Sequence, residues 1–104
     1  KGYRYRLHDK SLAGKPDIVF RKKNKIINIH GCFWHYHKNC KYFKMPLSNV
    51  SYWKQKLEGN RVKDKNNIEE LTNNGWKVLI VWECQLKNDL ENTLKRVLRF
   101  LENE

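Results

Sequence analysis

The segment from Ile29 to Cys40 is rich in side chains that ligate metals or transfer protons, because it holds three histidines and two cysteines. Cys32, His37 and Cys40 follow a Cys-x4-His-x2-Cys spacing, and the third cysteine of the chain, Cys84, comes after a distant apolar run. Zinc takes four such ligands in a tetrahedron, so the set predicts a structural zinc site. Buried free cysteines and a Cys32–Cys40 disulfide are the alternatives.

Two histidines of this segment, His30 and His35, remain free for acid–base chemistry if His37 binds zinc. His30 ends an apolar run, where a hydrogen-bonded core histidine is the alternative. Asp17 follows a Gly-Lys-Pro turn and begins the preceding apolar run, so antiparallel pairing would bring it near His30. On a basic protein, a carboxylate beside histidines suggests a magnesium site for phosphodiester cleavage.

The charge of the chain favours nucleic acid as its partner. The 104 residues include 22 Lys and Arg against 11 Asp and Glu, a formal net charge of +11. Neutralised phosphates release counterions, which drives such proteins onto nucleic acid, although a solvated charged face is the alternative. No apolar run reaches the roughly 18 residues of a membrane span, and the start does not resemble a signal peptide.

The elements that must position these residues form an α/β domain with a mixed sheet. A strand is expected at Tyr3–Asp9, and the β-rich runs between Asp17 and His30 predict a hairpin whose turn contains a left-handed Asn24. Residues 76–82 are apolar on both faces. That pattern is typical of a central strand that is covered on two sides and is often parallel to its neighbour.

Two helices complete the expected domain. The first is capped by Ser48 or Asn49 and ends near Asn74, before Gly75, and its polar middle at Asn60–Lys65 is interpreted as solvated or facing phosphate. Its buried stripe is predicted to consist of Trp53, Leu57, Ile68 and Leu71. The second helix is predicted from the helical spacing of Leu90, Leu94, Val97, Leu98 and Leu101.

Taken together, "LAGKPDIVF", "KIINIHGCFWHYHKNC" and "NGWKVLIVWEC" resemble the very short patch repair (Vsr) family of DNA mismatch endonucleases, over about Leu7 to Cys84. The resemblance implies a restriction-endonuclease-like three-layer α/β/α fold with a central mixed β-sheet. It also implies magnesium-dependent nicking of one strand of double-stranded DNA at a T:G mismatch left by deaminated 5-methylcytosine. A monomeric, cytoplasmic, bacterial or phage-like protein associated with the nucleoid follows from the same resemblance, with no membrane partner.

The resemblance also assigns roles to individual residues. It implies that Asp17 and the backbone carbonyl of Ile29 hold magnesium, and that His30 and His35 are the catalytic histidines. Ile29 stands where the best-known member has threonine, so only the carbonyl is carried over. The implied zinc ligands are Cys32, His37, Cys40 and Cys84. The residues implied to insert into the DNA base stack are Phe33, Trp34 and Trp53, with a place in the core as the alternative.

Two departures from the family pattern bear on function. Two residues separate His37 from Cys40 where the well-known member has one. The family also has an N-terminal helical segment with a catalytic-site glutamate, so we expect residues 1–104 to be a single endonuclease domain that lacks this segment. The alternative functions are the catalytic domain of a mobile-element or homing endonuclease, and a zinc-stabilised DNA-binding module without catalysis.

Overall fold

The computed structural model of the protein describes residues 3–38 and 40–103. Its sheet has the strand order β1 (Arg6–Leu7), β2 (Ile18–Phe20), β3 (Lys25–His30) and β4 (Lys77–Trp82). The pairs β1–β2 and β2–β3 are antiparallel, whereas β3 and β4 are parallel. The α/β class and the mixed sheet are therefore confirmed.

The hairpin of β2 and β3 turns through a short 3-10 helix, Arg21–Lys23, and ends at Asn24 with φ 55°. Asparagine is one of the few residues that adopt this left-handed conformation readily, as expected. The first strand begins at Arg6 instead of the predicted Tyr3, and it ends at Leu7 instead of Asp9 because the backbone of His8 turns at φ 50°. Beyond it the chain leaves the sheet, and Asp9 becomes part of a loop.

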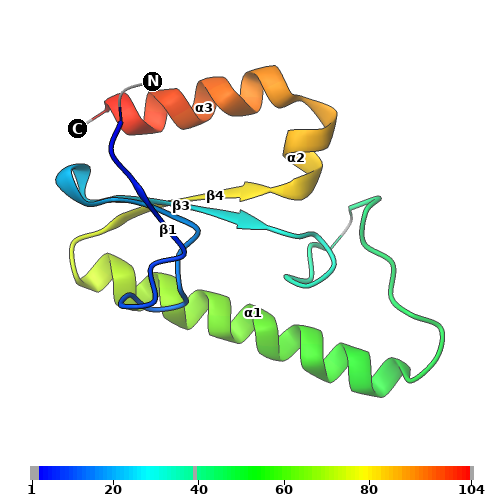
Figure 1. The fold of residues 1–104 in the computed structure, drawn as a ribbon. Coiled ribbons are helices and arrows are strands. Elements are labelled where there is room, and N and C mark those ends of the chain that lie inside the picture. The colour runs from blue at the N-terminus through cyan, green and yellow to red at the C-terminus, as the bar shows by residue number, and fades with distance from the viewer. Residues whose placement is uncertain (1–2, 39, 104) are drawn as a thin grey trace.

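The strand β4 lies between helices on both faces, as its apolar sequence indicates, but it is the edge strand of the described sheet and not a central one. Figure 1 shows α1 (Val50–Asn73) on one side of the sheet and α3 (Leu90–Glu102) on the other. An apolar pattern on both faces of a strand indicates that both faces are covered. It does not indicate whether another strand pairs with each of its two edges. A short helix, α2 (Glu83–Asn88), leaves the end of β4 and was not predicted.

Two hydrophobic clusters fill the two sides of the sheet, because successive strand residues point to opposite faces. The cluster on the α3 side contains Phe20, Ile27, Val81 and Leu101. The cluster on the α1 side contains Val19, Ile26 and Leu71. Most of the core is therefore contributed by β2, β3 and β4, and adjacent residues of β2 and of β3 belong to opposite clusters.

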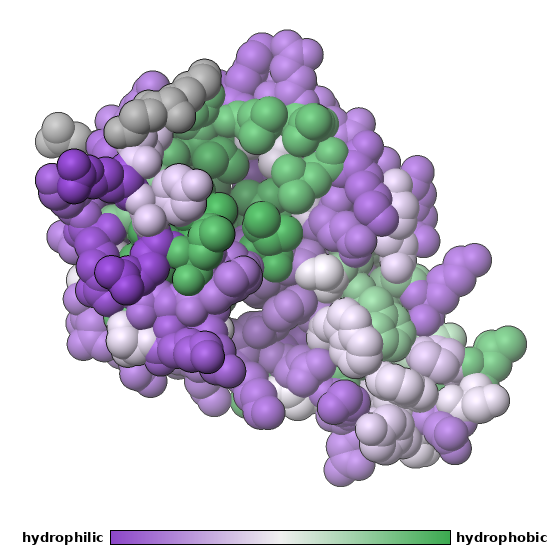
Figure 2. Space-filling view, in the orientation of Figure 1, coloured by the Kyte–Doolittle hydropathy of each residue, from purple (hydrophilic) through white to green (hydrophobic). Residues whose placement is uncertain are grey.

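The helices match their predicted ranges but not all of their predicted buried residues. In α1, Leu57 and Leu71 are buried, whereas Trp53 and Ile68 are only partly so. Leu90 and Leu94 of α3 are 54% and 49% exposed, because only the second half of that helix packs on the sheet. Figure 2 shows one large hydrophobic area on this face of the molecule, bordered by hydrophilic residues.

The start of α1 also differs from the expectation. The helix follows Asn49, which has φ 54° and whose side chain makes no capping hydrogen bond. None of the helices in the described ranges is long and apolar enough to cross a membrane.

Candidate active site and metal centre

The predicted zinc ligands converge in space. One ligand atom from each of Cys32, His37, Cys40 and Cys84 lies within 4.8 Å of all the others. Cys32 follows the end of β3 and Cys84 lies in the first turn of α2, so the parallel pairing of β3 with β4 brings them together. The three cysteines are free, which argues against the disulfide alternative. Three sulfur ligands and one imidazole form a set that suits zinc.

Local turns bring His37 back to this cluster. The backbone N–H of His37 donates to the Cys32 carbonyl at 2.9 Å, and the N–H of His35 donates to the Gly31 carbonyl at 3.1 Å. Tyr36 adopts φ 54° between them. The Nδ1 atom of His37 then lies 3.6 Å from the Cys84 sulfur. The extra residue before Cys40 is therefore accommodated without separating the ligand atoms.

The electrostatics of the cluster also fit a cation. Burial raises the pKa of the Cys32 thiol to about 12, so this thiol is protonated at neutral pH unless a cation displaces the proton. The pKa of Cys40 is lowered, mainly by a hydrogen bond from the Tyr42 backbone N–H. The cluster could therefore hold a metal ion, which would displace the proton of the Cys32 thiol.

Trp82 lies between this cluster and His30. Its ring stacks on the His37 ring, with centroids 3.9 Å apart and planes 8° from parallel. The His30 ring meets the same indole edge-on at 5.2 Å. One indole thus contacts both a residue of the Cys/His cluster and a histidine of the neighbouring pocket.

His30 and His35 stack on each other, with ring centroids 3.8 Å apart and planes 7° from parallel. The Nδ1 atom of His35 lies 2.6 Å from Oδ2 of Asp64, which comes from the middle of α1. These three side chains form a second group whose ligand atoms lie within 4.8 Å of one another. Asp64 was missed as a site residue, because the polar middle of the helix was interpreted only as solvated or facing phosphate.

Asp17 lies beside this group. It lines one pocket of about 190 Å³ together with His30, His35 and Asp64. The Ile29 N–H donates to Oδ2 of Asp17 at 2.7 Å, and the N–H of Asp17 donates to Oδ1 of Asn28 at 3.0 Å. Its Oδ1 atom is 3.7 Å from Nδ1 of His8. The structure thus places Asp17, Ile29, His30 and His35 in one pocket, although Asp17 is not in the group formed by the two histidines and Asp64.

His30 is the most perturbed base of the pocket. Burial lowers its pKa, and the neighbouring His35 lowers it further, while Asp64 and Asp17 act in the opposite direction. Its Nδ1 atom is buried and has no hydrogen-bond partner among the described residues. A neutral imidazole with an unused nitrogen can accept a hydrogen bond or bind a cation.

The three aromatic residues predicted to contact DNA form one cluster. The Phe33 ring lies 5.0 Å from Trp34 and 5.6 Å from Trp53, and the two indoles are 6.1 Å apart. Trp34 is 52% exposed, which does not fit the core alternative for this residue. Asn60 of α1 donates to the Trp34 carbonyl at 2.9 Å and so fixes the loop against the helix.

Comparison with known proteins gives a consistent set of relatives. Residues 1–42 match the family described as DNA mismatch endonuclease Vsr. The type II nicking enzyme V.XorIIP of Xanthomonas oryzae is 43% identical over 99 residues, which cover 93% of this chain and 72% of the relative. V.NmeAIP of Neisseria meningitidis, another type II nicking enzyme, is 47% identical over 88 residues. That match covers 85% of this chain and 62% of the relative.

The DNA mismatch endonuclease Vsr of Escherichia coli is 42% identical over 87 residues, which cover 84% of this chain. That match covers 55% of the Escherichia coli protein, so this chain spans little more than half of the relative's length.

Proposed function

The chain belongs to the Vsr family of DNA mismatch endonucleases, and on that basis we propose that it nicks one strand of double-stranded DNA at a T:G mismatch. The observation that carries the proposal is the pair of His35 and Asp64, joined at 2.6 Å in a pocket that also holds Asp17. A hydrolase needs a base of this kind near its phosphate, and a DNA-binding module does not.

The proposed fold is the restriction-endonuclease-like three-layer α/β/α fold. The sheet between α1 and α3 supports it, as does the position of Asp17 and His30 near one end of two neighbouring strands. We treat residues 1–104 as one domain of this kind, which acts as a monomer on DNA in a bacterial or phage-infected cytoplasm.

Magnesium would be held by the Asp17 carboxylate and the Ile29 carbonyl. Both are oxygen ligands, which this cation prefers. The Ile29 N–H already points to Asp17, and the N–H and C=O of one strand residue face the same side, so the carbonyl faces Asp17 as well. When bound there, magnesium would polarise the phosphate and stabilise its developing charge.

The two histidines would manage the proton. Asp64 accepts a hydrogen bond from Nδ1 of His35, which leaves Nε2 of the same ring free to take a proton from the attacking water. The buried and neutral His30 stacks on that ring and holds its orientation. Burial and the neighbouring His35 ring both lower the pKa of His30.

Zinc in the Cys32, His37, Cys40 and Cys84 site would have a structural role. It would fasten the loop that carries the catalytic His35 to the end of the sheet. All four protein ligands are present, so no position remains open for a reacting water.

The aromatic cluster would select the mismatch. An apolar side chain inserted between base pairs costs a few kcal/mol of unstacking, and a mismatch lowers that cost. The exposure of Trp34, whose ring contacts Phe33 and Trp53, supports this role for its side chain. The +11 net charge would hold the duplex by its phosphates.

A second candidate function is strand nicking that does not require a mismatch. It is favoured by the names of two relatives, V.XorIIP and V.NmeAIP, which are type II nicking enzymes.

The test uses matched, T:G-mismatched and single-stranded oligonucleotides of one sequence, each labelled at both ends, with and without magnesium. The proposal expects a magnesium-dependent nick in one strand of the T:G duplex alone. Equal nicking of the matched duplex would favour the second candidate. DNA binding without any cleavage would favour the non-catalytic module. An Asp17→Ala variant that cuts at the wild-type rate would remove the magnesium assignment.

A further inference from the structure

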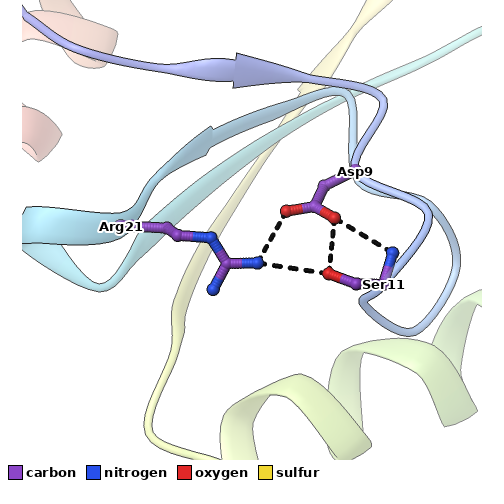
Figure 3. A network of polar contacts seen from close by, with 3 residues as sticks. All are labelled: Asp9, Ser11 and Arg21. Atoms are coloured by element: carbon purple, nitrogen blue, oxygen red, sulfur yellow. Dashed lines mark hydrogen bonds and ion pairs between the residues drawn. The ribbon is translucent and has the colours of Figure 1, made fainter.

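The loop before Asp17 is fixed by a network of polar contacts (Figure 3). Asp9 is only 6% exposed. Its Oδ1 accepts from the backbone N–H of Ser11 at 3.0 Å and from the Ser11 hydroxyl at 2.6 Å, and its Oδ2 accepts from Arg21 at 2.8 Å. Arg21 also donates to the Ser11 hydroxyl at 3.2 Å. The loop is thereby tied to the turn between β2 and β3.

The backbone of the same loop closes on itself. The N–H of Leu12 donates to the Asp9 carbonyl at 3.4 Å, the N–H of Lys15 donates to the Leu12 carbonyl at 3.1 Å, and the N–H of Asp9 donates to the Pro16 carbonyl at 3.3 Å. Pro16 is fully buried. These contacts hold the backbone of the loop in one conformation, and the loop residues that line the pocket are therefore held in position as well.

Gly14 allows the loop to lie against α1. A Cβ atom at this position would come within 2.7 Å of the amide nitrogen of Asn67, so a larger residue would require the Asn67 side chain or the loop to move. The backbone of Gly14 also has φ +76°, which glycine adopts without steric cost. This close approach brings the next residue, Lys15, to the rim of the catalytic pocket.

Lys15 is held in a conformation that its side chain disfavours. Its φ is +48°, in the left-handed region that non-glycine residues adopt at a cost. Backbone strain of this kind persists where the surroundings impose it, and it is concentrated at functional sites. A glycine here would relieve the strain, so the lysine is present at a conformational cost.

The surroundings of Lys15 indicate what that is. It lines the same pocket as Asp17, His35 and Asp64, and it is the one lysine or arginine among the described residues on the pocket wall. Its ammonium forms no hydrogen bond or ion pair with another described residue. Two carboxylates line this pocket and the substrate is itself an anion, so an ammonium beside the proposed magnesium would further reduce the repulsion where the phosphate enters.

We propose that Lys15 is a further catalytic residue, whose ammonium binds a non-bridging oxygen of the scissile phosphate and stabilises the charge that develops there. This inference rests on the proposed function. In the step it assists, the water oxygen bonds to phosphorus while the bond from phosphorus to one deoxyribose oxygen breaks. The proton of the water passes to His35, and the leaving oxygen takes a proton from solvent. Lysine provides a point charge suited to such an oxygen.

The test measures single-turnover nicking of the T:G duplex at saturating enzyme, in the full length of protein that the gene encodes. The variants are Lys15→Gln, Lys15→Gly and Lys15→Arg. The control is Lys10→Gln, an exposed lysine of the same loop that does not line the pocket. Loss of the ammonium should lower the rate constant about 100-fold, the usual effect of removing one transition-state donor, while arginine and the control keep most of the rate.

The glycine variant separates catalysis from folding. Lys15→Gly should melt no lower than the wild type, because it relieves the positive φ, and yet be as slow as Lys15→Gln. Wild-type rates in both variants would overturn the inference while leaving the proposed function in place. Weaker DNA binding with an unchanged saturated rate would overturn it too, by moving the ammonium to a flanking phosphate. A wild-type protein that nicks none of the duplexes would refute the proposed function itself.

Discussion

Oδ2 of Asp64 lies 2.6 Å from Nδ1 of His35, and the two residues are 29 positions apart in the sequence. Both side chains are partly buried, so solvent does not easily replace either partner. A carboxylate in this position selects the imidazole tautomer whose other nitrogen is free to act as a base. The catalytic unit of the proposed mechanism is therefore a pair drawn from a loop and from a helix.

The first prediction concerns this pair. An Asp64→Asn substitution keeps the size of the side chain but can donate to Nδ1, which favours the wrong tautomer. The single-turnover nicking rate should fall about 10²–10⁴-fold, within the range seen when a general base is lost or misoriented. DNA affinity, measured by fluorescence anisotropy, should change little. Glu69→Gln, an exposed substitution on the same helix, is the matched control, and equal rates for the two variants would contradict the pairing.

Some residues of the site could be predicted from the sequence because they lie close together along the chain. Others could not, because only the packing of distant elements brings them to the site. The cluster of Cys32, His37, Cys40 and Cys84 could be predicted because these residue types are rare and three of them lie close in sequence. Asp64 was missed because a carboxylate within a polar helix looks solvated, and only the packing of α1 against the sheet brings it to His35. The position of β4 at the edge was missed for a related reason, since its apolar faces reflect coverage by helices and not strand order.

The second prediction concerns pH and His30. Burial lowers the pKa of this histidine below its ordinary value of 6.5, so the unfolded chain binds a proton before the folded chain does. The free energy of unfolding should therefore fall as the pH drops below about 6.5, by up to about 1.4 kcal/mol per pH unit, until His30 is protonated in the folded state as well.

A His30→Phe variant isolates this contribution from other acid-sensitive groups. Urea unfolding at several pH values between 7 and 5 should give a shallower slope for the variant than for the wild type. The comparison is made with zinc present in both samples, so that protonation of the metal ligands contributes equally. Parallel curves would show that His30 has no lowered pKa in the folded protein.

The third prediction concerns metal binding. The purified protein should contain about one zinc ion per chain, the stoichiometry of a single four-ligand site. Because the Cys32 thiol has a pKa of about 12 without metal, zinc binding should release protons and weaken as the pH falls. Calorimetric titration in buffers of different ionisation enthalpy measures that release.

Substitution of the distant ligand gives a sharper result. Cys84→Ser should weaken zinc binding by more than about 100-fold, beyond the usual effect of changes outside the ligand set. It should also alter tryptophan fluorescence, because Trp82 stacks on His37 at 3.9 Å. Lys44→Gln, an exposed substitution in the neighbouring loop, should leave both properties unchanged. Equal zinc affinity for Cys84→Ser and wild type would remove Cys84 from the site.

The fourth prediction concerns the aromatic cluster. Trp34→Ala should weaken binding to the T:G duplex by about 1–3 kcal/mol, the usual value of one stacked base, with little change in melting temperature because the ring is half exposed. Anisotropy titrations of the matched and mismatched duplexes give the difference. Tyr5→Ala, which removes a 61% exposed ring next to the edge strand β1, is the control. Equal affinity of the wild type and Trp34→Ala for the mismatched duplex would refute the insertion of Trp34 between base pairs.

The last prediction concerns the frame that holds the pocket. Arg21 contacts both Asp9 and Ser11, and its guanidinium also lies 5.8 Å from the Trp76 ring centroid. An Arg21→Gln substitution should release the loop and speed amide hydrogen exchange at Leu12 and Lys15 about tenfold, since local opening governs exchange there. Arg6→Gln, on the exposed strand β1, should leave exchange in the loop unchanged.

The pH dependence of Arg21→Gln tests whether the side-chain contacts of Asp9 hold the loop. Hydrogen bonds from Ser11, with a smaller contribution from Arg21, lower the pKa of Asp9 below its ordinary value of 3.8. The stability that these contacts add is therefore present above that value and is lost as the pH falls through the lowered pKa. In Arg21→Gln the pKa of Asp9 should rise, which nuclear magnetic resonance titration of the Asp9 carboxyl carbon can follow. An unchanged pKa together with unchanged exchange would show that the loop is held by its backbone contacts alone.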